Sequence, residues 1–208
     1  MTDENEIDSR LNRVYKSSGN KRSLFDDWAA TYDEDLVGDL GYVADVEACR
    51  LFESLVPDRQ ARILDVGCGT GLVGRRLHQL GYADIHGNDY AEKMLDKARS
   101  TKVYQTLNQH DLTSPIETDL AYDAAIAVGV FGFDQPTAEH LVNITNCLRV
   151  GGIAIVTVNG KAWKETGWES KLENFDKKYP GTRLVEIQTI DYLRNEGIDG
   201  RLLTLKRC

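Results

Sequence analysis

Residues 63–72 read ILDVGCGTGL, a short apolar run that leads into three glycines at alternate positions. The apolar run predicts a buried strand, and the residues after it predict a helix with Val73, Leu77 and Leu80 along one face. Alternate glycines let the backbone turn sharply and let a ligand approach where no Cβ stands in the way. Open α/β sheets bind ligands at the carboxyl ends of their parallel strands, so this stretch predicts a ligand-binding loop.

Helical and strand patterns alternate on both sides of this loop. Strands are expected over residues 61–66, 84–88, 102–107, 122–130, 153–158, 183–190 and 201–206, and helices over 43–56, 91–98, 136–148 and 169–178. Strands that alternate with helices favour parallel pairing, and the last two strands favour a hairpin. We therefore expect an α/β fold with one Rossmann-like, doubly wound, mostly parallel seven-stranded sheet that ends in an antiparallel hairpin.

The first part of the chain differs in character from the rest. Residues 1–21 are polar with little apolar periodicity, which predicts a flexible arm. Residues 22–208 are expected to form a single domain, with a helical cap over about 22–56. In that cap Phe25, Trp28 and Tyr32 fall at helical spacing.

Composition narrows the class of partner. The chain has 208 residues and a formal net charge of −8, and an acidic surface repels phosphate backbones, so we expect no nucleic acid partner. The longest apolar run, Ala124 to Phe133, is far short of the roughly 20 residues that span a bilayer, so we expect no membrane partner. The acidic start does not resemble a secretory signal. Four widely separated cysteines without a C-x-x-C pair argue against disulfides and structural zinc, which favours a reduced, cytoplasmic setting.

The glycine loop is compatible with two classes of ligand. Gly69, Gly71 and Gly74 spell the dinucleotide pattern G-x-G-x-x-G, and Asp89 follows about 20 residues later. That pattern would bring a pyrophosphate to the helix N-terminus. Asp65 stands just before the loop, however, and its carboxylate disfavours a diphosphate and suits a cationic ligand. S-adenosylmethionine is such a ligand, because it carries an ammonium and a sulfonium.

Three stretches resemble the class I S-adenosylmethionine-dependent methyltransferases. Residues 65–71, DVGCGTG, resemble motif I of that family, and residues 86–95, HGNDYAEKML, are similar to its second strand end and following helix. Residues 148–152, LRVGG, resemble its turn into the fifth strand, with Val150 in place of the usual proline. Residues 25–33, FDDWAATYD, resemble the lead-in of a subgroup that includes the Williams–Beuren-region methyltransferase-like protein and bacterial small-molecule enzymes.

The resemblance implies S-adenosylmethionine as cofactor, and it implies which residues contact each part of that cofactor. Asp89 would accept hydrogen bonds from both ribose hydroxyls, or else cap a helix. Asp111 would lie near the adenine amino group, or else be a solvated loop aspartate, and Leu112 would offer its backbone N–H to the ring. The full expected cofactor set is Trp28, Tyr32, Asp65, Gly67, Cys68, Gly69, Gly71, Asp89, Tyr90, Met94, Asp111, Leu112, Val128 and Gly129.

Several of these residues have a second interpretation as structural residues. Asp65 is either a loop organiser or a ligand of the ammonium group. Cys68 has no adjacent base and is expected to be a small filler. Met94 suits the core as well as the adenine site, and Trp28 and Tyr32 either close over the cofactor or pack onto the core.

The expected acceptor side follows the fourth strand, where residues 128–131 read VGVF. This differs from the N-P-P-Y or D-P-P-Y of enzymes that methylate exocyclic amines, which argues against a DNA-base or release-factor substrate. Trp163 and Trp168 lie near the expected substrate side, with core packing favoured for at least one of them. His110 is the candidate general base. No histidine pair has zinc-ligand spacing and no catechol-type ligand set is recognisable, so we expect no metal.

The activity predicted from these residues is methyl transfer from S-adenosylmethionine to an O, N or S atom of a small molecule by in-line displacement. Two alternatives remain open at this point. One is a NAD(P)-dependent oxidoreductase, which keeps the glycine pattern but leaves Asp65 and Asp111 unexplained. The other is a non-catalytic protein that binds S-adenosylmethionine and regulates a partner.

Overall fold

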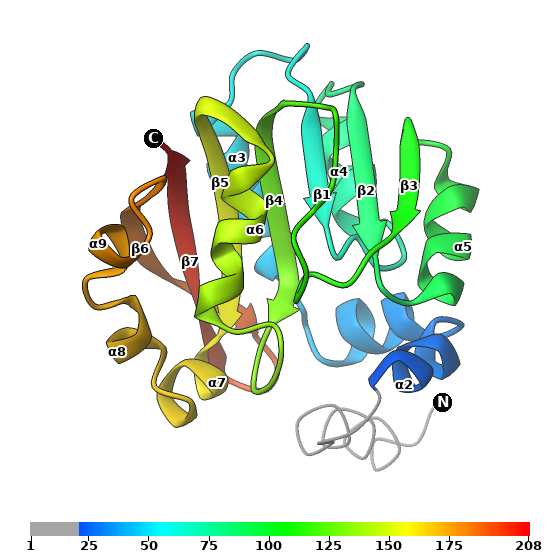
Figure 1. The fold of residues 1–208 in the computed structure, drawn as a ribbon. Coiled ribbons are helices and arrows are strands. Elements are labelled where there is room, and N and C mark those ends of the chain that lie inside the picture. The colour runs from blue at the N-terminus through cyan, green and yellow to red at the C-terminus, as the bar shows by residue number, and fades with distance from the viewer. Residues whose placement is uncertain (1–20) are drawn as a thin grey trace.

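The protein is described by a computed structural model over residues 21–208, shown in Figure 1. Its centre is one seven-stranded sheet in the order β3-β2-β1-β4-β5-β7-β6. The strands are β1 (Ile63–Val66), β2 (Ile85–Asp89), β3 (Thr106–Gln109), β4 (Tyr122–Phe131), β5 (Leu148–Asn159), β6 (Thr182–Leu193) and β7 (Ile198–Arg207). Strands β1 to β5 are parallel, and β7 runs antiparallel between β5 and β6. The expected mostly parallel sheet with a terminal hairpin is confirmed. The predicted arm falls almost entirely outside the described residues.

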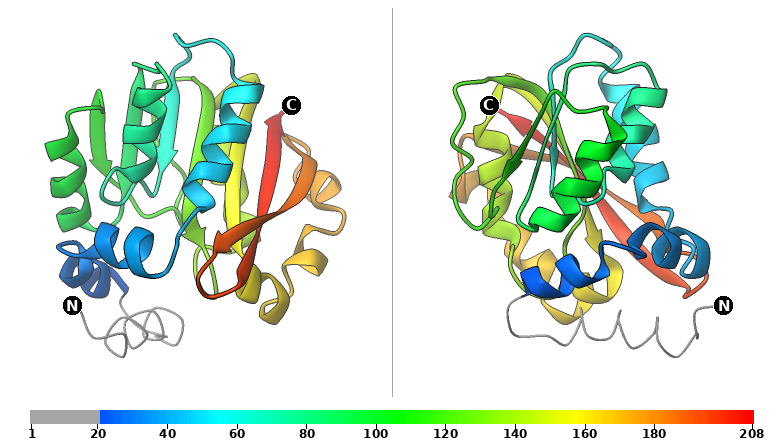
Figure 2. Two further views of the ribbon diagram at one scale, coloured as in Figure 1. Left: turned by 180° about the vertical axis from the view of Figure 1, so that it is seen from behind. Right: turned by 90° about the vertical axis from the view of Figure 1, so that its right-hand side faces the viewer.

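Helices cover both faces of this sheet (Figures 1 and 2). The helices of the described residues, on these faces and at the strand ends, are α2 (Lys21–Trp28), η1 (Glu34–Asp39), α3 (Ala44–Leu55), α4 (Leu72–Gln79), α5 (Glu92–Thr101), η2 (Ala138–His140), α6 (Leu141–Asn146), α7 (Gly160–Glu165), α8 (Trp168–Leu172) and α9 (Phe175–Lys178). Seen from behind, α3, α4 and α5 lie on one face, and α6 to α9 lie on the other. Within the described residues, no helix combines the length and apolar character needed to cross a membrane.

Some predicted elements begin or end elsewhere, for local backbone reasons. The helix expected over 169–178 is broken into α8 and α9, because Asn174 adopts a left-handed φ of 56° between them. The third strand starts at Thr106 rather than at 102, because Lys102 ends α5 with φ of 59°. A loop rather than a helix joins β3 to β4.

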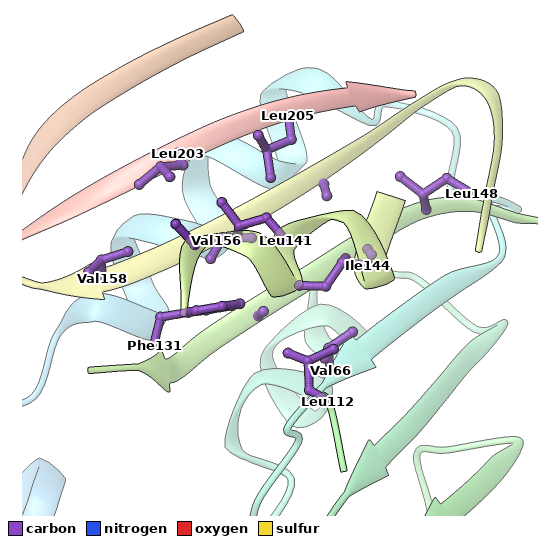
Figure 3. Packing of buried hydrophobic residues seen from close by; sticks show 14 of the residues in the cluster. Val66, Leu112, Phe131, Leu141, Ile144, Leu148, Val156, Val158, Leu203 and Leu205 are labelled. Atoms are coloured by element: carbon purple, nitrogen blue, oxygen red, sulfur yellow. The ribbon is translucent and has the colours of Figure 1, made fainter. Parts of the chain in front are cut away.

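The core forms two layers that follow the alternation of side chains along each strand. Leu64 and Val66 of β1 belong to the cluster on the α6 side, which Figure 3 shows with Phe131 of β4. Ile63 belongs to the cluster on the α3 and α4 side. A strand buried on both faces has no polar side, which explains the continuous apolar runs in the sequence.

The predicted cap divides into two parts. Helix α2 and η1 lie across the carboxyl ends of the parallel strands (Figure 1), whereas α3 packs on the sheet beside β4, β5 and β6. A further cluster joins Trp28 and Leu36 of the cap to Tyr192 and Ile198 of the β6–β7 hairpin. The hairpin therefore supports the cap from the far edge of the sheet.

Candidate active site

A cavity of about 750 Å³ lies between the cap and the carboxyl ends of the strands. The residues that line this cavity include members of the glycine loop, β2, the β3–β4 loop, β4, α2, η1 and β6. Of the expected cofactor residues, the following line it: Trp28, Tyr32, Gly67, Gly69, Asp89, Tyr90, Met94, Asp111, Leu112, Val128 and Gly129. The other three, Asp65, Cys68 and Gly71, do not.

Asp89 is the acid at the centre of the cavity wall. It ends β2 and is only 6% exposed. Its Oδ2 accepts the Gly69 N–H at 2.9 Å, and its Oδ1 accepts the Ala91 N–H at 2.9 Å. Burial raises the pKa of this carboxyl, and these backbone hydrogen bonds partly offset the rise. An ionised carboxylate offers about four acceptor sites, so roughly two remain for ligand hydroxyls.

Gly67 and Gly69 lie in the loop beside Asp89, and a side chain is disfavoured at each for a different reason. Both have positive φ values, 64° at Gly67 and 53° at Gly69. A Cβ on Gly67 would lie 2.4 Å from Val130 Cγ2, whereas a Cβ on Gly69 would meet no atom within 4 Å. Bare backbone at Gly69 therefore faces open space, where a ligand can approach it closely.

Asp65 lies behind the loop rather than in the cavity. It is 1% exposed, and its carboxylate accepts the Tyr104 hydroxyl at 2.7 Å. Burial raises the pKa of this carboxyl to about 7. A Cβ on Gly74 would lie 2.2 Å from the Tyr104 hydroxyl, so that glycine makes room for the tyrosine. The loop-organiser interpretation of Asp65 fits this geometry, and direct contact with an ammonium group does not.

Cys68 and Gly71 also serve the packing of the loop. Cys68 is buried against Leu95 and Ala98 of α5, and burial raises the pKa of its thiol well above the usual value. Such a thiol is a small apolar filler and a poor nucleophile. Gly71 precedes α4 with φ of 90°, and a Cβ there would lie 3.3 Å from the Cα of Ala98. The expectation that both residues contact the cofactor has no support in this geometry.

The β3–β4 loop forms one end of the cavity. Asp111 Oδ1 accepts the Thr113 N–H at 3.0 Å and the Thr113 hydroxyl at 2.8 Å. Burial works to raise the pKa of Asp111, but these bonds and the Arg22 guanidinium outweigh it, so the pKa lies below its ordinary value. Asp111 thus shapes its own loop and still lines the cavity as an ionised group. His110 also lines the cavity, with Nε2 3.2 Å from the Ser114 carbonyl oxygen.

An aromatic group from α2 and the segment after it covers the cavity. The rings of Trp28 and Tyr32 meet edge to face at 5.0 Å, and those of Phe25 and Tyr90 at 5.9 Å. Trp28 Nε1 donates to Oδ2 of the buried Asp35 at 2.5 Å, which holds the indole in place. Trp28 and Tyr32 therefore pack in the cap and line the cavity at once, and their contact with the cofactor stays a prediction.

A polar contact ties this cap to the glycine loop. Asp33, between α2 and η1, accepts hydrogen bonds from the Thr70 hydroxyl and from Arg75 Nη2, the latter at 2.6 Å. Thr70 belongs to the loop and Arg75 to α4. The cap position thus depends on the loop conformation. No motif in the sequence indicated this contact.

The acceptor side contains residues that the sequence analysis missed. Tyr42 and Tyr192 line the cavity next to Gly129, although 150 residues separate them in the chain. No local pattern could have paired them, because the contact exists only once the hairpin has folded against the cap. Trp163 and Trp168 do not line the cavity, and their rings stack in the core at 6.2 Å.

Known proteins share these features. Residues 63–152, which span the glycine loop, Asp89 and Asp111, match the family model described as a methyltransferase domain. The chain is 33% identical over 143 residues to human methyltransferase-like protein 27, over 66% of this chain and 57% of that protein. Residues 63–152 therefore match a methyltransferase domain, and the chain is similar to S-adenosylmethionine-dependent methyltransferases. Its subgroup within the family stays a prediction.

More distant relatives are named for different reactions. The chain is 29% identical over 112 residues to a tRNA U34 carboxymethyltransferase from Geobacter, over 51% of this chain and 35% of that protein. The N-methyltransferase NodS of Bradyrhizobium japonicum, solved with S-adenosyl-L-homocysteine, has the same fold, with a TM-score of 0.68, 14% identity, and 91% and 99% of the two chains covered. The chain spans about half the length of the curated relatives it matches, or less.

The family cofactor is S-adenosylmethionine, and the cavity fits it. Asp89 has acceptor sites for a ribose diol, Gly69 offers open backbone, and the aromatic cover suits a sulfonium. The dinucleotide interpretation loses its third glycine, because Gly74 contacts Tyr104 rather than open space.

Proposed function

We propose that this methyltransferase transfers a methyl group to an O, N or S atom of a small-molecule acceptor. The observation that carries the proposal is the charge of the residues that line the cavity. Among its lining residues in the described part of the chain, Arg22 is the single guanidinium and no lysine occurs, whereas three aspartates are present. An RNA acceptor needs a basic track for its phosphates, so this lining favours a small molecule.

When bound, S-adenosylmethionine supplies a methyl group on a sulfonium; the acceptor's lone pair bonds to the methyl carbon while the C–S bond breaks, its electron pair stays on sulfur, and a protonated acceptor releases its proton to solvent. The chain's residues supply position and charge. Asp89 and Gly69 would hold the ribose end, and the aromatic rings of Trp28 and Tyr32 would stabilise the cationic centre. The cap and hairpin exclude water and align the reactants, which can supply roughly 7–11 kcal/mol of the barrier.

His110, the general-base candidate from the sequence, lies far along the sheet from the expected acceptor segment. It follows β3, whereas the acceptor segment follows β4, three strand positions away in the sheet order. Neighbouring strands lie about 4.8 Å apart, so the two strand ends are separated by roughly 14 Å. This separation favours an acceptor that needs no protein base, or one whose proton leaves to solvent.

A reduced, cytoplasmic setting belongs to the same proposal. None of Cys49, Cys68, Cys147 and Cys208 is paired in a disulfide. Unpaired thiols are typical of proteins in reducing compartments.

The proposal is tested with purified full-length protein. Calorimetry with S-adenosylmethionine and S-adenosylhomocysteine measures cofactor binding, and mass spectrometry detects S-adenosylhomocysteine released in the presence of a metabolite panel or total tRNA. We expect turnover with a member of the small-molecule panel. Turnover with tRNA alone would overturn the choice of acceptor. Cofactor binding with turnover only when co-purifying proteins are added would instead favour a regulatory partner.

A further inference from the structure

Two tyrosines form a fixed pair at the hairpin side of the cavity. The rings of Tyr42 and Tyr192 meet edge to face with centroids 5.4 Å apart, and the residues are 8% and 6% exposed. A β-bridge pairs Tyr42 with Leu193, and the Val43 N–H donates to the Tyr192 carbonyl at 3.1 Å. The main chain thus holds both tyrosines in place across a large distance in sequence.

Both hydroxyls approach Gly129 in β4. A Cβ at Gly129 would lie 2.9 Å from the Tyr42 oxygen and 3.8 Å from the Tyr192 oxygen. Gly129 has φ of 77°, and its N–H donates to the Thr157 hydroxyl at 3.0 Å. The absence of a side chain at this position therefore leaves room for a phenol hydroxyl at the strand end where the methyl acceptor is expected.

The hydrogen bonds of this group can be followed proton by proton. The Thr157 oxygen accepts from Gly129. Its hydrogen bond with Tyr192 lowers the pKa of that phenol, which is the effect of a donor, so Thr157 donates its own proton to Tyr192. Tyr192 in turn is hydrogen bonded to Tyr42. A hydroxyl has one proton, so the bond between the two phenols uses one of their two protons. Within residues 21–208 no further hydrogen-bond acceptor is found for the other.

With Thr157 as the donor to Tyr192, one phenol proton remains in either orientation of the two phenols. If Tyr192 donates to Tyr42, the proton of Tyr42 is left, and in the reverse case that of Tyr192 is left. Burial raises the pKa of Tyr192 to about 12 and that of Tyr42 well above its usual value. Both phenols are therefore protonated at neutral pH and act as donors rather than as bases.

We propose that this phenolic O–H of the Tyr42–Tyr192 pair binds a hydrogen-bond-accepting oxygen of the methyl acceptor and so positions it. Apolar side chains of Leu36, Val130, Phe131 and Leu193 make up most of the rest of this wall, and Asn159 adds one amide. The acceptor class that fits is a compact, mostly apolar molecule with an oxygen function, rather than a phosphorylated or strongly cationic one. This inference rests on the proposed function and names the residues that select its substrate.

The test uses two probes on full-length protein saturated with S-adenosylhomocysteine. Acetophenone carries a carbonyl acceptor on an apolar body, and ethylbenzene has a similar body without oxygen. Ligand-observed NMR gives their dissociation constants. The carbonyl stretch of acetophenone, measured by infrared difference spectroscopy, reports a hydrogen bond directly and needs no variant.

We expect the bound carbonyl stretch to move to lower frequency in the wild type. In the double variant Tyr42→Phe/Tyr192→Phe that shift should disappear, and acetophenone should bind about three- to tenfold more weakly. Ethylbenzene affinity should not fall. Each single variant keeps one phenol proton without a protein acceptor, so each should retain the shifted stretch. Tyr179→Phe, whose phenol lies outside the cavity lining, is the matched control.

The inference is overturned if the wild type leaves the carbonyl stretch unshifted, or if the double variant binds acetophenone as tightly as the wild type. S-adenosylhomocysteine affinity is measured in parallel and should stay within about twofold in every variant. Failure of the wild type to bind S-adenosylhomocysteine would overturn the proposed function. Intact binding without a carbonyl shift would overturn only the role of the tyrosine pair.

Discussion

Asp89 combines two tasks that compete in many carboxylates. It accepts main-chain hydrogen bonds from Gly69 and Ala91, which hold the loop, and it keeps acceptor capacity toward the cavity. Asp89→Ala should therefore weaken S-adenosylhomocysteine binding by about 1–3 kcal/mol, since ligand hydroxyls lose their acceptor. Calorimetry measures the change. Asp96→Ala, exposed on α5, is the control, and equal affinity of Asp89→Ala and wild type would mean that the ribose assignment is wrong.

Asp65 predicts a dependence of stability on pH. Its folded-state pKa of about 7 lies above the ordinary value, so the folded protein binds this proton more tightly than the unfolded chain. The stabilisation is complete below about pH 4 and is lost as the pH rises through 7. Each unit of elevation corresponds to about 1.4 kcal/mol.

The measurement is urea unfolding of wild type and Asp65→Asn at pH 5 and pH 8. Because the asparagine does not ionise, the free energy of unfolding of Asp65→Asn should rise relative to the wild type between these pH values. A difference that is the same at both pH values would show that Asp65 titrates normally.

At the scale of elements, the contact of Asp33 with Thr70 and Arg75 joins the cap to the glycine loop and α4. The Asp33 and Arg75 side chains are about a third exposed, so the ion pair itself contributes at most about 1 kcal/mol to stability. Asp33→Asn should therefore leave global unfolding nearly unchanged but speed cofactor release several-fold, because the cap opens more readily. Stopped-flow fluorescence of Trp28 measures release.

Glu47→Gln provides the control for this change, because Glu47 pairs with the exposed Arg50 on α3 away from the cap contact. A release rate in Asp33→Asn equal to that of Glu47→Gln would show that the contact does not govern the cap.

For the whole molecule, one cavity is built from segments that span residues 22 to 193. A ligand that binds only this assembled state stabilises the entire fold by mass action. S-adenosylhomocysteine at 100 times its dissociation constant should add about 2.7 kcal/mol, which raises the melting temperature by roughly 5–11 °C for a chain of this size. Thermal unfolding by circular dichroism measures the shift. NADH at the same concentration is the control, and an equal shift with it would contradict the cofactor assignment.

Many strands and the ligand-binding loop could be predicted from the local pattern of apolar residues and glycines. Apolar runs such as 122–130 marked buried strands, and the glycines at 67–71 marked the loop, because both signals depend on neighbouring residues. The prediction of one helix over 169–178 was also wrong for a local reason. Asn174 adopts a left-handed conformation, which asparagine tolerates but which its presence in a sequence does not predict.

By itself, the amino-acid sequence determined the order of strands and helices, the loop and the acid that follows it, because each depends on side chains a few positions apart. Only the tertiary structure decided that Asp65 turns to Tyr104 and away from the cavity, and that Tyr42 meets Tyr192 over Gly129. These contacts join residues distant in the chain. Their geometry depends on how the cap, sheet and hairpin pack together, which no short stretch of sequence records.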